Sequence, residues 1–413
     1  MLNKNGEREL AYVVIVDGIE ELPGYDRVES ARIGGWRCIV PKGQFKVGDP
    51  GIYFEIDSRV PSDNPAFAFM EKRNYKVKTQ KMCKSISSGL LMHAEDFGWN
   101  ICGVGEGGNP NVRQAIVEND GTLHFPDDES RFLTQKLGVT YADAEDNQRK
   151  APSSDKYKKM SQRHPEIFRQ NWARWMMKRD WGKKLMFFFF GKAKDKKNGW
   201  PAWVQKTDEE RIQNMPWILS DPGEWIVTEK IDGTSTTFTM KRGRGFKKNQ
   251  MYVCSRNVCF DSVDKPCYYE TNVYWEMAKK YDIFYVLTRL LEELPAAEWV
   301  TIQGETYGPG IQRRDYSAPE HGFMAFNLIS SDRGRWNSCA MKNLLEKGFG
   351  VPCVPILEPH FQFNGMNVDE LLACADGDST LDNKPREGLV FRSEDGTKSF
   401  KAVSNSYLLK YHG

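Results

Sequence analysis

The feature that most constrains this chain is a lysine placed between two strand-like runs of residues. Residues 224–227 are largely apolar and predict a β-strand that leads into Lys230. Asp232 and Gly233 follow as turn formers, and residues 234–240 have the composition of a second strand. We therefore expect a β-hairpin that holds one amine at its lip, where a ligand phosphate can reach it.

The chemistry of this turn depends on how the amine is surrounded. A solvated, protonated lysine is a weak nucleophile, whereas a neighbouring cation or a dry pocket lowers its pKa and frees the lone pair. Asp232 offers the oxygen ligand that hard metal ions prefer. The pattern Lys-x-Asp-Gly is typical of a covalent nucleotidyl-lysine site, and the alternative is an ordinary hairpin turn shaped by Asp and Gly.

Length and composition predict a multidomain globular chain. It has 413 residues, of which 40% are hydrophobic and 28% are charged. The longest strongly apolar run, residues 185–190, is too short to span a bilayer, and the first residues lack the apolar segment of a signal peptide. The nine cysteines form no Cys-x-x-Cys pair. We therefore expect reduced thiols, no structural zinc, no membrane partner and a cytoplasmic location.

Residues 1–140 predict an all-β domain. A strand at 11–16, a hairpin through Gly34 and Gly35, and a strand at 51–57 are separated by turns rich in Gly and Pro. Short strands punctuated in this way predict a small barrel, with an OB-fold as the expected type. Such barrels often present a groove to nucleic acid strands. We expect this domain to bind RNA, and a barrel used only for packing is the alternative.

Residues 141–199 differ from the rest in charge. The net charge of the chain is +2, yet the stretch from Arg149 to Lys197 carries about +12, which leaves the remainder acidic. Aromatic residues between Phe168 and Arg179 recur at helical spacing, and Gly182 is a natural helix end. We interpret the segment as a basic helical connector or insertion that contacts a polyanion. A solvated helix face or a flexible tether is the alternative.

Residues 200–413 predict an α+β domain with mostly antiparallel sheets. Helical periodicity covers residues 272–294 as one or two helices. The strand patterns lie at 225–230, 234–240, 251–254, 299–305, 322–329 and 388–392.

Polar and aromatic residues follow Lys230 in an ordered series. Each is ordinary by itself, because a glutamate at a strand end is usually solvated and a phenylalanine within a strand is usually core. The series consists of Arg256 after a strand, Glu305 before a glycine turn, Phe326 within a strand, Glu387 before the strand that contains Val390, and Lys401 near the end.

In this order the segments match the six sequence blocks of the covalent nucleotidyltransferase superfamily, which contains polynucleotide ligases and messenger-RNA capping enzymes. The chain most resembles ATP-dependent RNA ligases with an amino-terminal OB domain, of the type found in Deinococcus. Segments 206–214 and 399–410 take part in the resemblance, whereas the basic stretch does not. The resemblance implies a multidomain fold: an OB-fold barrel at 1–140, an insertion at 141–199, and an α+β adenylyltransferase domain with ATP-grasp-like antiparallel sheets at 200–413.

The resemblance also implies a reaction. Lys230 is expected to attack the α-phosphorus of ATP, which forms a lysyl-AMP phosphoramidate and releases pyrophosphate. Asp232, Glu305 and Glu387 are expected to organise Mg²⁺ or Mn²⁺, and Lys401 to hold the α-phosphate. AMP then passes to an RNA 5′-phosphate, and a 3′-hydroxyl displaces AMP to leave a phosphodiester.

A nucleotide pocket follows from the same comparison. Glu305 is also expected to accept hydrogen bonds from the ribose, while Phe326 and Val390 cover the two faces of the adenine; ordinary core packing is the alternative for Phe326. Many RNA ligases carry Lys-x-Lys in the last block, but here residues 401–403 read Lys-Ala-Val. The other implied nucleotide-contacting residues are Glu229, Arg256 and, in place of the second lysine, Lys410.

Two other classes of protein stay open at this point. A capping-type transferase would use the same blocks, and a nucleic-acid-binding protein can retain a dead transferase domain. The presence of Lys230, Glu305, Glu387 and Lys401 disfavours the second class. Three residues follow Lys410, where capping enzymes and DNA ligases carry a further OB domain. We expect a monomeric RNA ligase that acts in RNA repair on RNA ends or on nicked duplexes with RNA on the 3′-hydroxyl side.

Overall fold

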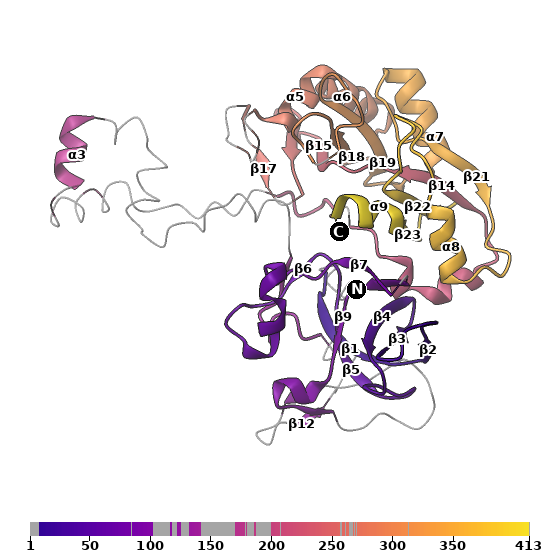
Figure 1. Cartoon of the computed structure of the whole chain (residues 1–413). Coiled ribbons are helices and arrows are strands. Elements are labelled where there is room, and N and C mark those ends of the chain that lie inside the picture. Colours follow the sequence, from indigo (N-terminus) through magenta and orange to yellow (C-terminus); the bar gives the residue numbers. More distant parts are fainter. Residues whose placement is uncertain are drawn as a thin grey trace.

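The computed structural model places two β-rich domains one above the other (Figure 1). The residues described are 8–83, 85–101, 116–117, 122–124, 132–141, 170–177, 179, 186, 200–206, 208–256, 258–260, 262–263, 267, 269, 271–312 and 314–412.

The first domain is built mainly of β-strands, as its short strand-like runs and its turns rich in Gly and Pro predict. Its central sheet has the antiparallel order β1-β5-β9, and a second sheet has the order β2-β3-β4. Gly34, with φ of 60°, lies in the predicted hairpin turn between β3 and β4. These six strands are β1 (Ala11–Ile15), β2 (Gly18–Glu21), β3 (Val28–Ile33), β4 (Trp36–Pro41), β5 (Pro50–Phe54) and β9 (Leu90–Met92).

Shorter elements complete this domain around a core that includes Val13, Phe54 and Phe67. The core also contains Leu133 and Leu137, so the chain returns to the first domain after residue 131. The shorter elements are β6 (Ser58–Arg59), η1 (Pro65–Arg73), β7 (Thr79–Met82), β8 (Ser85–Ser88), η2 (Ala94–Phe97), β10 (Asn100–Ile101), β11 (Ile116–Val117), β12 (Thr122–His124) and β13 (Thr140–Tyr141).

The second domain contains two antiparallel sheets. The smaller has the order β21-β14-β22-β23, and the larger has the order β17-β16-β15-β18-β19-β20. The strands are β14 (Trp225–Lys230), β15 (Thr234–Lys241), β16 (Gln250–Cys254), β17 (Cys259–Phe260), β18 (Trp299–Tyr307), β19 (Gly322–Ser330), β20 (Gly334–Arg335), β21 (Ile356–Phe361), β22 (Gly388–Ser393) and β23 (Ser399–Val403).

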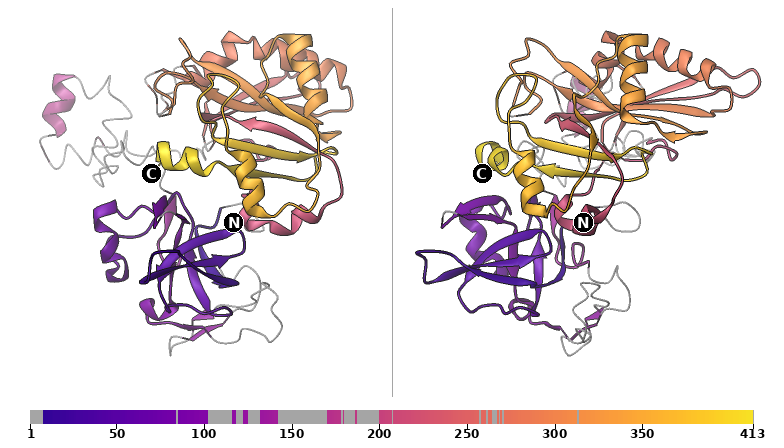
Figure 2. Two further views of the ribbon diagram at one scale, coloured as in Figure 1. Left: turned by 45° about the vertical axis from the view of Figure 1, so that its right-hand side comes forward. Right: turned by 90° about the vertical axis from the view of Figure 1, so that its right-hand side faces the viewer.

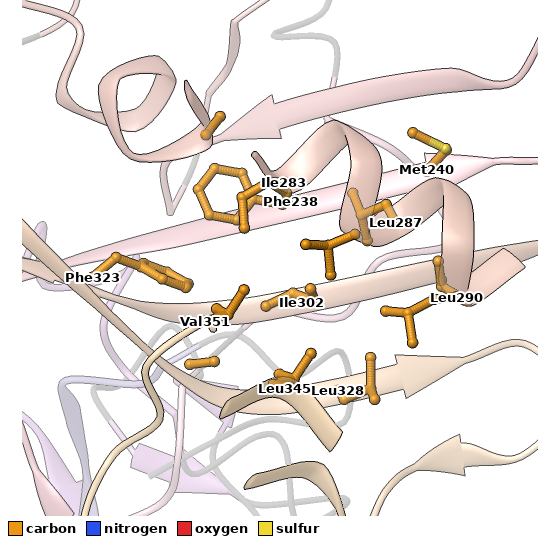
Figure 3. Close-up of a cluster of buried hydrophobic side chains, with 14 of the residues drawn as sticks. Phe238, Met240, Ile283, Leu287, Leu290, Ile302, Phe323, Leu328, Leu345 and Val351 are labelled. Atoms are coloured by element: carbon orange, nitrogen blue, oxygen red, sulfur yellow. The ribbon is translucent and has the colours of Figure 1, made fainter. Parts of the chain in front are cut away.

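Helices cover the outer face of the larger sheet, on the side away from the first domain (Figures 1 and 2). The predicted helical stretch forms α5 (Val273–Lys280) and α6 (Ile283–Glu293), whose apolar residues pack on the sheet. Figure 3 shows Leu287 and Leu290 of α6 against Phe238 and Ile302 of the strands. The remaining helical elements are η4 (Ile212–Asn214), η5 (Pro216–Ser220), α7 (Ser338–Lys342), η6 (Asn343–Gly348), α8 (Val368–Ala375), α9 (Asn405–Tyr407) and η7 (Leu408–His412).

One sequence expectation is wrong. Residues 225–230 and 234–241 do not pair as a hairpin, because β14 belongs to the smaller sheet and β15 to the larger. The turn through Asp232 and Gly233 therefore carries the chain from one sheet to the other, since β14 pairs instead with β21 and β22. Lys230 thus ends a strand at the junction of the two sheets.

A buried polar cluster joins the two domains, and we call this contact the seam. The Asn214 side-chain oxygen accepts hydrogen bonds from the Tyr12 hydroxyl (3.1 Å) and from Trp36 Nε1 (2.7 Å). Its amide nitrogen donates to Glu55 Oε1 at 2.9 Å. Because buried polar groups are costly without partners, each domain completes the hydrogen bonding of the other here.

The seam also has an apolar part. Val403 and Leu408 of the second domain belong to the same buried cluster as Trp36 and Ile33 of the first domain. The first domain therefore covers the end of β23, the strand that carries Lys401.

The basic segment is described only in part. Its residues include α3 (Asn171–Met177), which agrees with the predicted helix, and the Arg179 guanidinium lies 3.7 Å from the centre of the Trp175 ring. Phe168, Gly182 and most of the basic residues lie outside the described part of the chain. Within the described residues, no helix is both long enough and apolar enough to cross a membrane.

Candidate active site

Lys230 and Glu387 meet at the end of the smaller sheet. Lys230 is the last residue of β14 and pairs with Gly388, the first residue of β22. This register brings Glu387, which directly precedes β22, to the lysine: Nζ lies 2.7 Å from Oε1 and 2.8 Å from Oε2. Their side chains are 24% and 15% exposed, so the pair is shielded but still reachable.

A glycine brings Glu305 to the same place. A Cβ atom on Gly233 would lie 2.3 Å from the Thr306 carbonyl oxygen and 2.9 Å from Glu305 Cγ, which is closer than real atoms approach. The Lys-x-Asp-Gly turn therefore presses directly against the part of β18 that carries Glu305. Alternation along β18 turns Val300 and Ile302 toward the helices and Glu305 toward the opposite, polar face.

Three carboxylates surround the amine electrostatically. Burial would lower the pKa of Lys230, but the charges of Glu387, Glu305 and Asp232 outweigh burial and raise it. Burial and the charges of Glu387 and Asp232 raise the pKa of Glu305 to about 8, against the opposing charge of Lys230. The three carboxylates therefore favour bound protons on Glu305 and Lys230, and a metal cation at the same place would compete with those protons.

This donor set fits a divalent cation in chemistry, since hard cations take carboxylate oxygens. Among the residues that the structure describes, no three Asp, Glu, His or Cys side chains lie close enough together to hold a metal ion by themselves. A metal at Asp232, Glu305 and Glu387 would need water or substrate oxygens to complete its ligands, and the metal role of these residues stays a prediction.

Two tyrosines that the sequence did not indicate hold Asp232. The Tyr407 hydroxyl donates to Asp232 Oδ2, and the Tyr316 hydroxyl accepts a hydrogen bond of 2.6 Å from the Asp232 backbone N–H. Tyr407 lies in segment 399–410, which takes part in the family resemblance, and this position was the one sequence feature that could have indicated a role for Tyr407. Tyr316 lies in a loop between blocks, where the sequence gave no signal.

Lys401 lies in a group of cations near the seam. It is 8% exposed, and its backbone N–H donates to the Glu210 carbonyl at 2.7 Å. Burial and the charges of Arg8, Arg211 and Lys230 lower the pKa of Lys401 to about 7, although Asp208 acts in the opposite direction. A buried cation cluster of this kind is suited to a phosphate group.

Arg211 is a further residue that the sequence did not single out. It is 5% exposed and bonds Asp57 of the first domain at 2.9 Å through Nη2. Its Nε and Nη1 atoms are buried without a hydrogen-bond partner in the described structure. Arg256, which the sequence did indicate, pairs with Asp208, so both arginines belong to the surroundings of Lys401.

The two residues predicted to cover the adenine lie on different sheets, Phe326 on β19 of the larger sheet and Val390 on β22 of the smaller sheet. Phe326 is the extra residue of a bulge in β19, opposite the step from Gln303 to Gly304, and it is half-buried. The Arg392 guanidinium lies 5.9 Å from the centre of its ring. In the smaller sheet, the Thr228 hydroxyl donates to the Val390 carbonyl at 3.3 Å.

Glu229 and Lys410 are less directly connected to Lys230. Glu229 alternates with Lys230 along β14, and its Oε2 atom accepts from the Thr380 N–H and hydroxyl at 2.9 and 2.8 Å, while Oε1 is buried without a partner in the described residues. Lys410 is exposed in the carboxy-terminal turn, with Nζ 5.2 Å from the centre of the Tyr411 ring. Their nucleotide roles stay predictions.

Two family models match parts of the chain. Residues 223–412 match the RNA ligase family model, and residues 10–94 match an OB-fold domain model. No curated protein matches the chain significantly.

Solved structures of the Naegleria gruberi RNA ligase are similar over nearly the whole chain. The structure with pyrophosphate has a TM-score of 0.68 and 24% identity, and the match covers 98% of this chain and 99% of that one. A variant of that ligase solved with AMP and Mn has a TM-score of 0.68 and 25% identity, with the same coverage. Another variant, at 24% identity, was solved with ATP and Mn.

The likeness confirms the expected fold class, an OB-fold domain followed by an α+β domain with antiparallel sheets. A Deinococcus-type subfamily stays a prediction. The RNA ligase family model covers β14 to the carboxy-terminal turn, including the Lys230–Glu387 pair, so the second domain is similar to the RNA ligase family over the part that carries the candidate site.

Proposed function

We propose that the chain is an ATP-dependent RNA ligase that works through a lysyl-AMP intermediate on Lys230. The observation that carries this proposal is the shielded contact between the Lys230 amine and the Glu387 carboxylate, 2.7 Å apart, with Glu305 and Asp232 around it. A lysine held only for structure would not need three carboxylates around it.

In the first step, the neutral amine of Lys230 attacks the α-phosphorus of ATP. The ammonium loses its proton, for which Glu387 is the acceptor within hydrogen-bond distance. The N–P bond forms while the bond from the α-phosphorus to the bridging oxygen breaks, and pyrophosphate leaves. Asp232, Glu305 and Glu387 would hold Mg²⁺ or Mn²⁺, which supplies charge neutralisation when bound.

Lys401 and Arg211 are the groups that we assign to the phosphates. Lys401 is buried, and its surroundings lower the pKa of its amine to about 7, so the negative charge of a nearby phosphate would stabilise its ammonium form. Arg211 offers two buried N–H groups without partners, which suits a bidentate contact to phosphate oxygens.

The following steps seal RNA. AMP passes from Lys230 to an RNA 5′-phosphate, and a 3′-hydroxyl then attacks the adenylylated end, forms the phosphodiester and releases AMP. We propose that the enzyme acts in RNA repair as a monomer, on RNA ends or on nicks with RNA on the 3′-hydroxyl side. The first domain and the basic segment are the surfaces that we assign to RNA, because OB-folds and cationic stretches favour nucleic acid.

Incubation with radiolabelled ATP or GTP tests the proposed reaction. We expect label from [α-³²P]ATP, and not from GTP, to remain on the denatured protein. Sealing of a nicked duplex set, with RNA or DNA on each side of the break, then defines the substrate. Attachment of GMP would favour the capping-type alternative, and attachment of neither nucleotide would favour a dead transferase domain.

Replacing Phe326 with leucine is expected to weaken ATP use without weakening the fold. Leucine keeps most of the burial but loses base stacking, which contributes roughly 1–3 kcal/mol in base–aromatic contacts. The ATP concentration for half-maximal labelling should rise about tenfold, with an unchanged melting temperature. A lowered melting temperature at unchanged ATP requirement would instead identify Phe326 as an ordinary core residue.

A further inference from the structure

A loop outside all the sequence blocks ties the active-site segments together. It runs over residues 308–321, between β18 and β19, and begins three residues after Glu305. Arg314 is a buried charged residue of this loop, and the side chains of Arg314 and its ion-pair partner Asp382 are each 2% exposed. A buried pair of this kind loses much of its attraction to desolvation, so its position in the fold needs an explanation beyond stability.

The arginine fixes the segment that leads to Glu387. Besides pairing with Asp382, its guanidinium donates to the Pro385 carbonyl and, at 3.3 Å, to the Lys384 carbonyl. Pro385 lies two residues before Glu387. The planar guanidinium of Arg314, with its several donors, therefore fixes the backbone that leads to Glu387, whose carboxylate contacts Lys230.

The same loop also contacts the turn through Asp232 and Gly233, which directly follows Lys230. The Tyr316 ring lies 4.2 Å from the Arg314 guanidinium, and its hydroxyl accepts the hydrogen bond from the Asp232 N–H at 2.6 Å. The Gln312 side chain donates to the Gly233 carbonyl at 3.1 Å. Tyr316 itself has φ of 56°, a left-handed conformation that a bulky residue adopts only when its surroundings enforce it.

We propose that Arg314 and Tyr316 are positioning residues for nucleotidyl transfer, which set the Lys230 turn and Glu387 relative to each other. This inference rests on the proposed lysyl-AMP reaction. Both partners of the 2.7 Å contact are held from one loop: the turn through Tyr316 and the segment before Glu387 through Arg314. Reaction rates are steeply sensitive to such geometry, and a displacement of about 1 Å can cost about a hundredfold.

The test measures the rate of AMP attachment in a single turnover as a function of ATP concentration, together with the melting temperature. Arg314→Gln and Tyr316→Phe should each lower the maximal rate by about tenfold or more, while the ATP concentration for half-maximal rate changes little. Tyr316→Phe keeps the ring, so it serves where Arg314→Gln does not fold. Arg314→Lys should not restore the rate, because a lysine cannot reproduce the guanidinium contacts.

Two comparisons sharpen the result. Asp382→Asn should slow the same step, and its effect combined with Arg314→Gln should be less than additive because both remove one contact. Lys280→Gln is the matched control, since Lys280 holds the far end of the same loop through Glu320 and the His321 carbonyl; it should label at the wild-type rate.

If Arg314→Gln and Tyr316→Phe keep the wild-type maximal rate and only their melting temperature falls, the loop serves structure alone. That result would overturn the inference and leave the proposed function intact. A wild-type chain that attaches no AMP would overturn the proposed function and this inference together.

Discussion

Replacing Lys230 with alanine is expected to abolish covalent labelling by ATP and leave the fold intact. Its amine is the nucleophile that we assign, and it contacts the Glu387 carboxylate at 2.7 Å. Removing a nucleophile removes the covalent route altogether. The measurement is retention of ³²P-AMP on the denatured protein, with circular dichroism to confirm folding.

Lys398→Ala is the matched control, because Lys398 is a lysine of the same domain whose exposed side chain pairs with Asp221. It should label normally. Lys230→Ala should also seal pre-adenylylated RNA poorly if the amine helps to hold phosphate in the last step. AMP that still attaches to Lys230→Ala would show that the nucleophile lies elsewhere.

The second large effect is expected from Glu387→Gln and Glu305→Gln, each of which should slow labelling by about a hundredfold. Glutamine keeps the shape of the side chain but removes the charge that holds the amine and fits a divalent cation. Glu298→Gln is the matched control, because Glu298 forms an exposed pair with Arg244. Near-normal labelling by Glu387→Gln, or by the wild type in excess chelator, would contradict the carboxylate assignment.

The pH dependence of labelling tests the role of Glu305. Since Glu305 has a pKa of about 8, it is protonated below that pH and ionised above it. The ratio of the wild-type rate to the Glu305→Gln rate should therefore rise as pH increases through about 8, because the titration of other groups such as Lys401 is common to both proteins. The melting temperature offers a second readout: Mn²⁺ should stabilise the wild type more above this pH than below it, because ionised carboxylates bind the cation.

Much of the fold was accessible from local patterns. The strand-like runs that carry Lys230, Glu305 and Phe326 correctly predicted β14, β18 and β19, and the helical periodicity at 272–294 correctly predicted α5 and α6. The site residues Glu387 and Lys401 came from the ordered resemblance, since neither is distinctive by itself.

The remaining features depend on contacts between distant segments. A turn with Asp and Gly looks the same whether it closes a hairpin or crosses between sheets, and the true partner of Lys230 lies 157 residues away. Arg211 is set apart by buried N–H groups and by an ion pair with Asp57 of the first domain, and neither feature can be read from its neighbours in the sequence. Tyr316 acts from a loop without periodicity, so no local pattern can indicate it.

The seam has a consequence for the exchange of domains between ligases. Asn214 completes the hydrogen bonding of Tyr12, Trp36 and Glu55, while Trp36 helps to cover Val403 and Leu408. A chimaera that joins the first domain of one protein to the second domain of another would lose these contacts. Polar atoms of Tyr12, Trp36 and Glu55 would lack their Asn214 partner, and Val403 and Leu408 would lose their apolar cover. A functional graft must therefore carry residues 208–214 together with the first domain, which makes the amino-terminal OB-fold an integral part of the catalytic architecture and not a detachable module.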